Sequence, residues 1–313
     1  MDKSEWVKAF RAALPAESLQ EDCPMSSCTT LRLGGPADLL ADPASEDELR
    51  RMLALAAEYG LPVTVIGRGS NLLVRDGGIR GLVIRVGPRM KGIRRDGTDL
   101  TAMAGTTLSE LAHAAAAEGL DGLAFASGIP GTAGGGVIMN AGAYGGELSQ
   151  TVTLVGGLRM NGDPFRYDNA EMRFGYRESR LQHEDGIVTR VRVSLRPGDP
   201  DAIRAAMQEL SVKRSEKQPL QQPSAGSTFK RPEGYFAAAL IDQCGLKGAR
   251  IGGAAVSEKH AGFLVNLGGT AADFEALMRH VQTVYTSASA FVWSRRYAYS
   301  ARHDGGDRCG ICC

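Results

Sequence analysis

The sequence has neither an excess of charge of one sign nor a long apolar run. Its 313 residues include 36 Lys and Arg against 35 Asp and Glu, a formal net charge of +1. This balance argues against a nucleic-acid or membrane-surface binder. No apolar run reaches the ~18 residues of a membrane span. Residues 1–6 are charged and lack the apolar core of a secretory signal, so we expect a cytoplasmic protein. A monomer is a separate expectation.

Cysteine and histidine are few, and their spacing does not suggest a metal site. Six cysteines are present, three of them in the last five residues. In a reducing compartment we expect Cys23, Cys28 and Cys244 to be free thiols. The Cys309-Gly-Ile-Cys312 pair has no second pair to complete a zinc site, and the histidines lack ligand spacing. The sequence therefore predicts no bound metal.

The chain length predicts two or three domains, with an N-terminal helix and lead-in segment over residues 1–28. From Thr29 the pattern alternates between helix and strand, as in an α/β protein. Capping boxes at 45–48 and 107–110 each begin a helix, and a third cap at 270–273 begins the last amphipathic helix. The clearest boundary is Pro197-Gly-Asp-Pro200. Further elements are predicted as strands over 61–66, 82–86, 187–195 and 261–267, helices over 202–212 and 237–243, and a hairpin over 154–168 with a type I′ turn at Asn161-Gly162.

The most unusual stretch is the glycine-rich run from Ala126 to Gly146, which is interrupted by Ile129, Val137 and Met139. Glycine permits positive φ and close approach of the backbone to another surface. We interpret the run as a loop wrapped on a large anionic ligand, with backbone N–H groups turned toward phosphate oxygens. The alternative is a set of tight turns between buried strands.

A second glycine cluster, Gly67-Arg-Gly-Ser-Asn71, lies far from the first in the sequence. Neither cluster is a P-loop, because no Gly-Lys-Ser/Thr closes it. Neither fits the dinucleotide fingerprint of a glycine-rich strand-to-helix turn followed by an acidic residue. Two separate backbone cradles suit a long cofactor such as FAD, whose pyrophosphate lies between its two ends.

Two side chains outside these clusters are candidates for chemistry. Arg177, in Phe174-Gly-Tyr-Arg177, could clamp a carboxylate through two hydrogen bonds, or it could form a surface ion pair with Glu178. Ser227, between Gly226 and Thr228, could present its hydroxyl to a substrate, or it could only form a turn. The segment from Ser257 to His260 carries three ionisable groups and is interpreted as a solvated face.

Taken together, these motifs resemble the UDP-N-acetylenolpyruvoylglucosamine reductases, flavoenzymes of peptidoglycan precursor synthesis, in their shorter subtype. The resemblance covers roughly residues 29–285, with the motifs in the family's order. The matching segments are 30–38, 67–74, 126–132, 139–144, 175–177, 218–220, 226–230 and 256–266.

The resemblance implies an α+β fold: a PCMH-type FAD-binding module over 29–197, with subdomains of about 29–92 and 93–197. A smaller α+β substrate domain over 201–285 and an aberrant tail over 286–313 follow. It also implies FAD as carrier and NADPH as hydride source, with a nucleotide-sugar substrate. The cofactor-binding residues that we expect are Gly67, Arg68, Gly69, Ser70, Asn71, Leu72, Gly128, Ile129, Pro130, Gly131, Thr132, Gly134, Asn140, Gly142 and Ala143.

The resemblance further implies roles for individual side chains. Hydride would reach C3 of an enolpyruvyl group and a proton would reach C2. Arg177 matches the family arginine that stabilises charge on the substrate carboxylate, and Ser227 matches the serine that delivers the proton. Tyr176 is a further substrate-binding candidate, and four more come from charge and domain alone: Arg214, Lys217, Lys230 and Lys259.

The chain departs from the family pattern at two places. Arg68 stands where the family usually has glycine, so it could touch a cofactor phosphate or alter the loop geometry. After about Thr286 the family's terminal segment, which carries a second glutamate that polarises the substrate, is missing, and no Glu follows Glu275. Codons for residues 286–301 can be chosen so that a frame shifted by one base spells a family-like end. That end reads Glu-Arg-Phe-Gly-Val-Cys-Leu-Glu-Pro-Glu-Val-Arg-Ile-Leu-Gly.

We therefore hypothesise that the tail is an out-of-frame translation, with the lost glutamate overlapping the codons of Arg295 and Arg296. Asp304 and Asp307 are the carboxylates left in the tail. The alternatives to an active reductase are another FAD-dependent oxidoreductase of this fold and a flavin binder inactivated by the lost glutamate. Covalent flavin attachment is disfavoured, because neither glycine cluster contains His.

Overall fold

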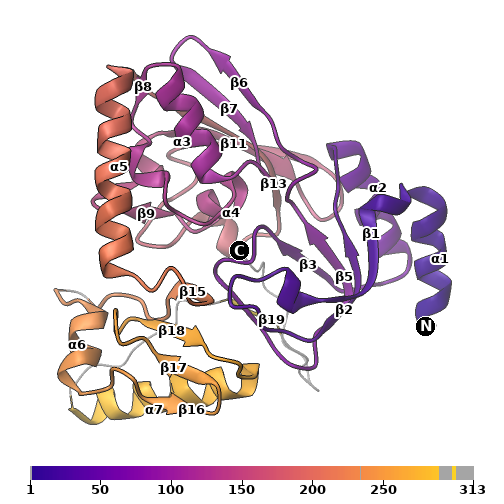
Figure 1. Cartoon of the computed structure of the whole chain (residues 1–313). Helices are drawn as coiled ribbons and strands as arrows, with labels where there is room; N and C mark the ends of the chain where they lie inside the picture. The colour runs from indigo at the N-terminus through magenta and orange to yellow at the C-terminus, as the bar shows by residue number, and fades with distance from the viewer. Residues whose placement is uncertain (1, 233, 289–297, 301–313) are drawn as a thin grey trace.

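The computed structural model describes residues 2–232, 234–288 and 298–300 of the chain (Figure 1). Its first sheet has the strand order β1-β2-β5-β3, in which β1 is antiparallel and the other pairs are parallel. The expected lead-in segment is thus part of this sheet, because β1 pairs along its length with β2. These strands are β1 (Leu19–Pro24), β2 (Pro36–Ala41), β5 (Ile79–Arg85) and β3 (Val63–Ile66).

Two helices pack beside one another and cover one side of the first sheet (Figure 1). The N-terminal helix α1 (Lys3–Ala13) buries Trp6 and Phe10 in the same core as Leu49 and Met52 of α2 (Glu46–Glu58). The hydroxyl of Ser45 accepts a hydrogen bond from the Glu48 amide at 3.1 Å, which confirms the predicted N-cap. The Glu48 carboxylate accepts from the Ala44 amide at 2.8 Å instead of from Ser45, so the capping box is only half formed.

The second sheet is antiparallel, with the order β12-β11-β13-β7-β6. Its strands are β6 (Ile93–Asp96), β7 (Asp99–Met103), β11 (Val152–Leu158), β12 (Pro164–Asp168) and β13 (Ile187–Ser194). The alternation predicted for β13 is confirmed, since Val191 and Val193 are buried. The hairpin of β11 and β12 is also confirmed, but its type I′ turn is wrong. Only Gly162 has positive φ (87°), and the loop covers residues 159–163.

Short helices close the second sheet on the side that faces the glycine-rich run. Helix α3 (Leu108–Ala117) begins with the complete capping box of Thr107 and Glu110. Helix α4 (Ala133–Ile138) lies against β13, and the long helix α5 (Pro200–Lys217) leads from this sheet to the last domain (Figure 1). The smaller strands here are β8 (Leu120–Asp121), β9 (Gly142–Ala143), β10 (Gly146–Glu147) and β14 (Arg196–Pro197).

The third sheet has the order β15-β18-β17-β16 and is antiparallel. Helices α6 and α7 pack on it (Figure 1). Its elements are β15 (Ser224–Ser227), α6 (Ala237–Gln243), β16 (Arg250–Ile251), β17 (Ala254–Val256), β18 (Phe263–Asn266) and α7 (Ala271–Ala288).

The last domain is anchored to the first by two segments close to the glycine loops. Leu31, Leu33 and Leu73 are buried in the same core as Phe274 of α7. The carboxylate of Asp76 accepts hydrogen bonds from the first amides of α7, at 2.9 Å from Ala271. Strand β4 (Leu72–Val74) pairs in parallel with β19 (Ala298–Ser300). Of the predicted aberrant tail, residues 289–297 and 301–313 lie outside the described part of the chain.

Candidate active site

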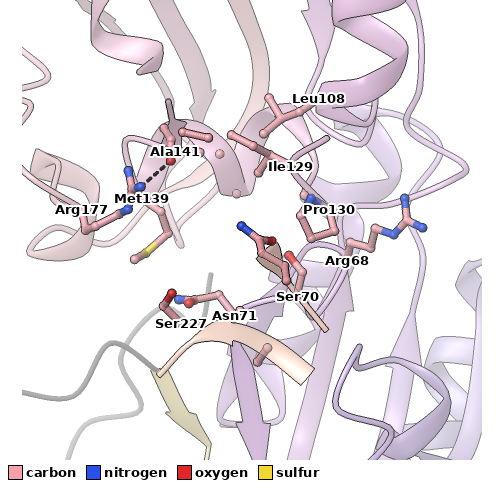
Figure 2. A pocket seen from close by; sticks show the side chains of 18 of the residues that line it. Arg68, Ser70, Asn71, Leu108, Ile129, Pro130, Met139, Ala141, Arg177 and Ser227 are labelled. Atoms are coloured by element: carbon pink, nitrogen blue, oxygen red, sulfur yellow. Dashed lines mark hydrogen bonds between the residues drawn. The ribbon is translucent and has the colours of Figure 1, made fainter. Parts of the chain in front are cut away.

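Both glycine clusters and the start of the third domain line one cavity of about 360 Å³, the central cavity (Figure 2). The first cluster contributes Gly67 to Asn71, and the second contributes Ile129 to Thr132 and then Gly135 to Ala143 at intervals. Arg177 approaches from one side and Ser227 from the other. Segments more than 150 residues apart in the sequence thus meet around one space, as the two-cradle interpretation requires.

The loop from Gly67 to Ser70 presents a row of unused backbone donors. Within the described part of the chain, the amides of its four residues donate no hydrogen bond. Buried or half-buried amides normally find an acceptor, and successive N–H groups in a turn form an anion-binding concavity. An anion in this concavity would satisfy these donors.

Of the first three residues of this loop, Gly67 and Gly69 must be glycine, whereas Arg68 can carry a side chain. A Cβ on Gly69, whose φ is +64°, would lie 2.1 Å from the carbonyl oxygen of Cys28. A Cβ on Gly67 would lie 2.7 Å from Oγ1 of Thr132, so this glycine lets the two clusters approach each other. Arg68 is not among the residues of positive φ in the described chain, and a side chain there leaves the loop geometry unstrained.

The second cluster is partly a helix rather than only a wrapped loop. Residues 133–138 form α4, whose N-cap Thr132 accepts a hydrogen bond from the Gly135 amide at 3.4 Å. Gly134 packs against Ala104, where a Cβ would approach to 2.9 Å. Gly134 thus serves packing, whereas Gly135 and Gly136 line the central cavity.

Arg177 projects a half-buried guanidinium into the central cavity, and it forms no ion pair with an acidic residue of the described part of the chain. Its Nη1 donates to the carbonyl of Asn140 at 2.9 Å and its Nη2 to the carbonyl of Gly142. The alternative ion pair with Glu178 does not form, since that carboxylate lies 3.0 Å from His183. Burial lowers the pKa of Arg177 from its usual value. A desolvated, oriented cation of this kind favours an anionic ligand.

Asn140 holds Arg177 in place and does not itself reach the cavity. Its side-chain amide donates to the carbonyl of Gly175 at 2.9 Å and accepts from the Ser149 amide at 3.0 Å. Both residues adopt positive φ, 40° for Asn140 and 57° for Arg177. Strained backbone at non-glycine positions persists where the surroundings enforce it. Asn140 was expected to bind cofactor directly, and its position makes it a support for Arg177.

Other expected residues fall into three groups. Lys217 and Arg214 line the central cavity, and burial lowers the pKa of Arg214. Gly134 lines a neighbouring apolar cavity and Gly128 a neighbouring basic one. The remaining four lie away from the central cavity: Leu72 is buried in β4, Tyr176 is exposed and stacks on Arg177, Lys259 donates to the carbonyl of Ser215, and Lys230 does not line the cavity.

Sequence reasoning missed several residues of the third domain and of α4. His260 was interpreted as part of a solvated face, yet it lines the central cavity beside Phe263, with ring centroids 4.9 Å apart. Burial lowers the pKa of His260. The apolar strand that follows at 263–266 was the available indication that this turn faces inward. Met139 and Gln218 also line the cavity.

A small apolar cavity of about 20 Å³ adjoins the row of donors. It is lined by Val65, Ile66, Val86, Ile187 and Val188, and it shares Gly67, Thr132 and Gly135 with the central cavity. The free amides thus lie between an apolar space and a space containing Arg177 and Ser227. A cofactor whose pyrophosphate lies on these amides would extend from them into the central cavity, the larger of the two spaces.

The cysteines and the candidate metal ligands are described over the same residues. Cys23, Cys28 and Cys244 are free thiols, as predicted, and burial raises the pKa of Cys23 to about 11. In the described residues, His, Cys, Asp and Glu form no group of three or more suited to a metal. No helix among them has the length and apolarity needed to cross a membrane.

Comparison with known families agrees with the geometry. A family model of an FAD-binding domain matches residues 37–162. The protein is therefore a flavoprotein, and it has the predicted PCMH-type fold. A second model, "UDP-N-acetylenolpyruvoylglucosamine reductase, C-terminal domain", matches residues 218–289. The chain belongs to the UDP-N-acetylenolpyruvoylglucosamine reductase family, which confirms the resemblance found in the sequence.

Individual relatives cover most of the chain. The reductase of Lactiplantibacillus plantarum is 47% identical over 89% of this chain and 92% of its own length. That of Caldanaerobacter subterraneus is 47% identical over the same shares. The crystal structure of the reductase from Thermus caldophilus superposes with a TM-score of 0.78 at 37% identity, covering 90% of this chain and 98% of that one. An alkyldihydroxyacetonephosphate synthase shares the fold alone, with a TM-score of 0.50 at 16% identity.

Proposed function

We propose that this chain reduces UDP-N-acetylenolpyruvoylglucosamine to UDP-N-acetylmuramate in peptidoglycan precursor synthesis, with NADPH as reductant and FAD as carrier. One observation carries the proposal. The unused amides of Gly67 to Ser70, the cation of Arg177 and the hydroxyl of Ser227 line a single cavity. The family membership of the chain gives the substrate. The cytoplasm as location and a monomeric state belong to the same proposal.

The reaction adds a hydride to C3 and a proton to C2 of the enolpyruvyl group. When bound, FAD accepts the hydride of NADPH and passes it to the substrate carbon. The amides of Gly67 to Ser70 would hold the cofactor's pyrophosphate, with the flavin ring in the central cavity.

Arg177 would bind the substrate carboxylate and stabilise the negative charge that spreads onto it after hydride addition. Its guanidinium is fixed by the carbonyls of Asn140 and Gly142, so it need not reorganise during the reaction. Preorganised charge in a water-poor site lowers the barrier more than the same charge in water. The absence of an acidic partner in the described residues leaves its remaining N–H groups for the substrate.

Ser227 would donate the proton to C2. Strand β15 ends at this residue and pairs with β18 at Phe263, which directs the segment into the central cavity. An alcohol is a weak acid, but an enolate beside a carboxylate is basic enough to take its proton. The nearby cations Arg177, Arg214 and Lys217 stabilise the alkoxide that remains.

The proposal is tested by separating the two halves of the reaction with anaerobic stopped-flow absorbance of the flavin. Ser227→Ala should keep FAD and should be reduced by NADPH at the parental rate. Its reoxidation by the enolpyruvyl substrate should fall by about 10²–10⁴-fold. The matched control is Ser109→Ala, at a serine of α3 that lines neither the central cavity nor the neighbouring basic one. Unchanged reoxidation in Ser227→Ala, or an equal loss in both variants, would contradict the proposal.

The missing terminal glutamate favours one alternative, a flavin binder that no longer turns over. No Glu follows Glu275, and Glu275 itself is engaged with Arg75 at 2.6 Å. The half-reactions are therefore measured both on this chain and on a version with the reading frame restored after residue 285. Substrate-dependent oxidation of NADPH by the restored version supports the reductase. Flavin binding without turnover in both versions supports the alternative.

A further inference from the structure

A second cavity, which we call the basic cleft, lies beside the central cavity and has no assigned ligand. It measures about 900 Å³ and is enclosed by the Ser27–Arg32 turn, the Gly67–Arg68 corner, the α3 N-terminus and residues 220–224. Its lining includes no acidic residue and has five basic ones: Arg32, Arg68, Arg85, Lys91 and Arg214. A cleft lined by one sign of charge concentrates ligands of the opposite sign.

Two of these five cations are already neutralised by carboxylates. Arg85 makes a two-point contact with Asp42 at 2.6 Å, and Lys91 lies 2.7 Å from Glu110. In contrast, Arg32 and Arg68 form no ion pair and no side-chain hydrogen bond within the described residues. The charge available to a ligand in the basic cleft therefore comes from these two arginines, with Arg214 at the border.

The basic cleft opens into the central cavity. The two share Gly67, Arg68, Pro130, Thr132, Arg214, Gly226 and Phe263. Figure 2 shows Arg68 directed away from Arg177 and Ser227, on the far side of Pro130. One extended ligand can therefore place a reactive end near Ser227 and a charged end near Arg68.

The turn that carries Arg32 is strained and held from both sides. Arg32 has a φ of +54°, which is uncommon for a residue with a side chain. Thr30 donates from Oγ1 to the carbonyl of Ser224 at 2.7 Å, and Asn266 donates to the carbonyl of Leu31 at 2.9 Å. Hydrogen bonds from the third domain thus fix the direction of Arg32. Such enforced strain is typical of functional positions.

The proposed reaction leaves one anion without a partner. The amides of Gly67 to Ser70 serve a pyrophosphate, and Arg177 serves the substrate carboxylate. Lys217 lines the central cavity and is available to the diphosphate of the nucleotide sugar. NADPH carries, in addition, a phosphomonoester on its adenosine ribose, which NADH lacks. A phosphomonoester is a dianion with several acceptor oxygens, and two unpaired guanidinium groups match it.

We propose that the basic cleft takes the adenosine 2′-phosphate end of NADPH, and that Arg68 with Arg32 makes this chain select NADPH over NADH. The inference rests on the proposed function for the identity of the reductant. It assigns a role to Arg68, the residue at which the chain departs from the glycine usual in the family.

The test measures binding of NADP⁺ and of NAD⁺ to the flavin-loaded protein by titration calorimetry, which requires no turnover. Arg68→Gln and Arg32→Gln each remove one charge from the cleft, and Arg94→Gln is the matched control. Arg94 is an exposed arginine of β6 that lines neither cavity. Each cleft variant should weaken the binding of NADP⁺ by about tenfold, because a charge-assisted hydrogen bond is lost, and should leave the binding of NAD⁺ unchanged. Binding of adenosine 2′,5′-bisphosphate, measured in the same way, should weaken by a similar factor.

Four outcomes would overturn the inference: unchanged NADP⁺ binding in both variants, equal weakening of NADP⁺ and NAD⁺, weakened binding of UDP, or loss of FAD. The third would assign the cleft to the nucleotide sugar and the fourth to the flavin. Failure of the proposed function is recognised separately. In that case the parent protein with a restored reading frame holds flavin but does not oxidise NADPH when the enolpyruvyl substrate is added.

Discussion

Replacing Gly69 by alanine tests whether the first glycine loop holds the flavin. The new Cβ would lie 2.1 Å from the carbonyl oxygen of Cys28, whereas ordinary contact begins near 3.4 Å. A backbone oxygen cannot swing aside, so the loop itself must move by about 1 Å. The positive φ adds about 1 kcal/mol of strain and the overlap about 1–3 kcal/mol. We expect the free energy of unfolding to fall by about 2–4 kcal/mol.

The displacement should also misalign the amides of Gly67 to Ser70. Loss of two charge-assisted hydrogen bonds, at about 1.5–3 kcal/mol each, would weaken the binding of FAD by at least about 10²-fold. The control is Gly97→Ala, since Gly97 has a similar φ of +61° with nothing within 4 Å of the added Cβ. It should lose about 1 kcal/mol of stability and keep parental FAD affinity.

Stability is measured by urea unfolding, and FAD affinity by quenching of flavin fluorescence. If Gly69→Ala bound FAD as tightly as Gly97→Ala does, the loop would not be the cofactor's phosphate cradle. The same conclusion would follow if both variants lost flavin to the same degree, because the loss would then reflect stability alone.

Three further predictions concern the site and its supports. Arg177→Lys keeps the charge but loses the fork held by Asn140 and Gly142, so kcat/KM for the enolpyruvyl substrate should fall by about 10–100-fold while FAD content stays unchanged. Restoring the reading frame after residue 285 should raise kcat by about 10²-fold or more without changing FAD affinity; equal kcat in both versions would refute a role for the lost glutamate. Hydrogen bonds, the largest from Lys91 and the next from Thr107, lower the pKa of Glu110 to about 2. The ionised Glu110 carboxylate therefore contributes to stability above pH ~4.3, and this contribution is lost as the pH falls toward 2. Glu110→Gln should therefore flatten the acid limb of a stability-against-pH curve, by at most about 1 kcal/mol because the side chain is half exposed.

Much of the fold could be predicted because local patterns agree with tertiary packing. The Thr107 capping box and the alternation of β13 each specify their own element, and both appear as expected. The turn at Asn161-Gly162 was misjudged because the pair favours a two-residue turn only when the strands end beside it. Here the Arg159 amide donates to the carbonyl of Asp163 at 2.7 Å, so the loop that this hydrogen bond closes is longer than two residues.

The site could be predicted only in part, because its residues depend on contacts between distant segments. The glycine loops are visible in the sequence as composition. Arg177 and Ser227 were candidates from their sequence surroundings, and their expected roles came from the family resemblance. The inward position of His260 was indicated only by the apolar strand that follows it, and the supporting role of Asn140 depends on contacts that no short motif encodes. The basic cleft likewise combines a strained turn at Arg32 with a loop at Arg68, more than 30 residues away.

The central claim is that the two glycine clusters hold FAD with its reactive ring facing Arg177 and Ser227. Diffraction from crystals of the yellow protein with the enolpyruvyl nucleotide sugar bound tests it most directly. The account predicts flavin density in the central cavity, with its pyrophosphate on the amides of Gly67 to Ser70 and the enolpyruvyl group within about 4 Å of Ser227. Flavin bound at another surface, or a substrate group remote from both side chains, would contradict it.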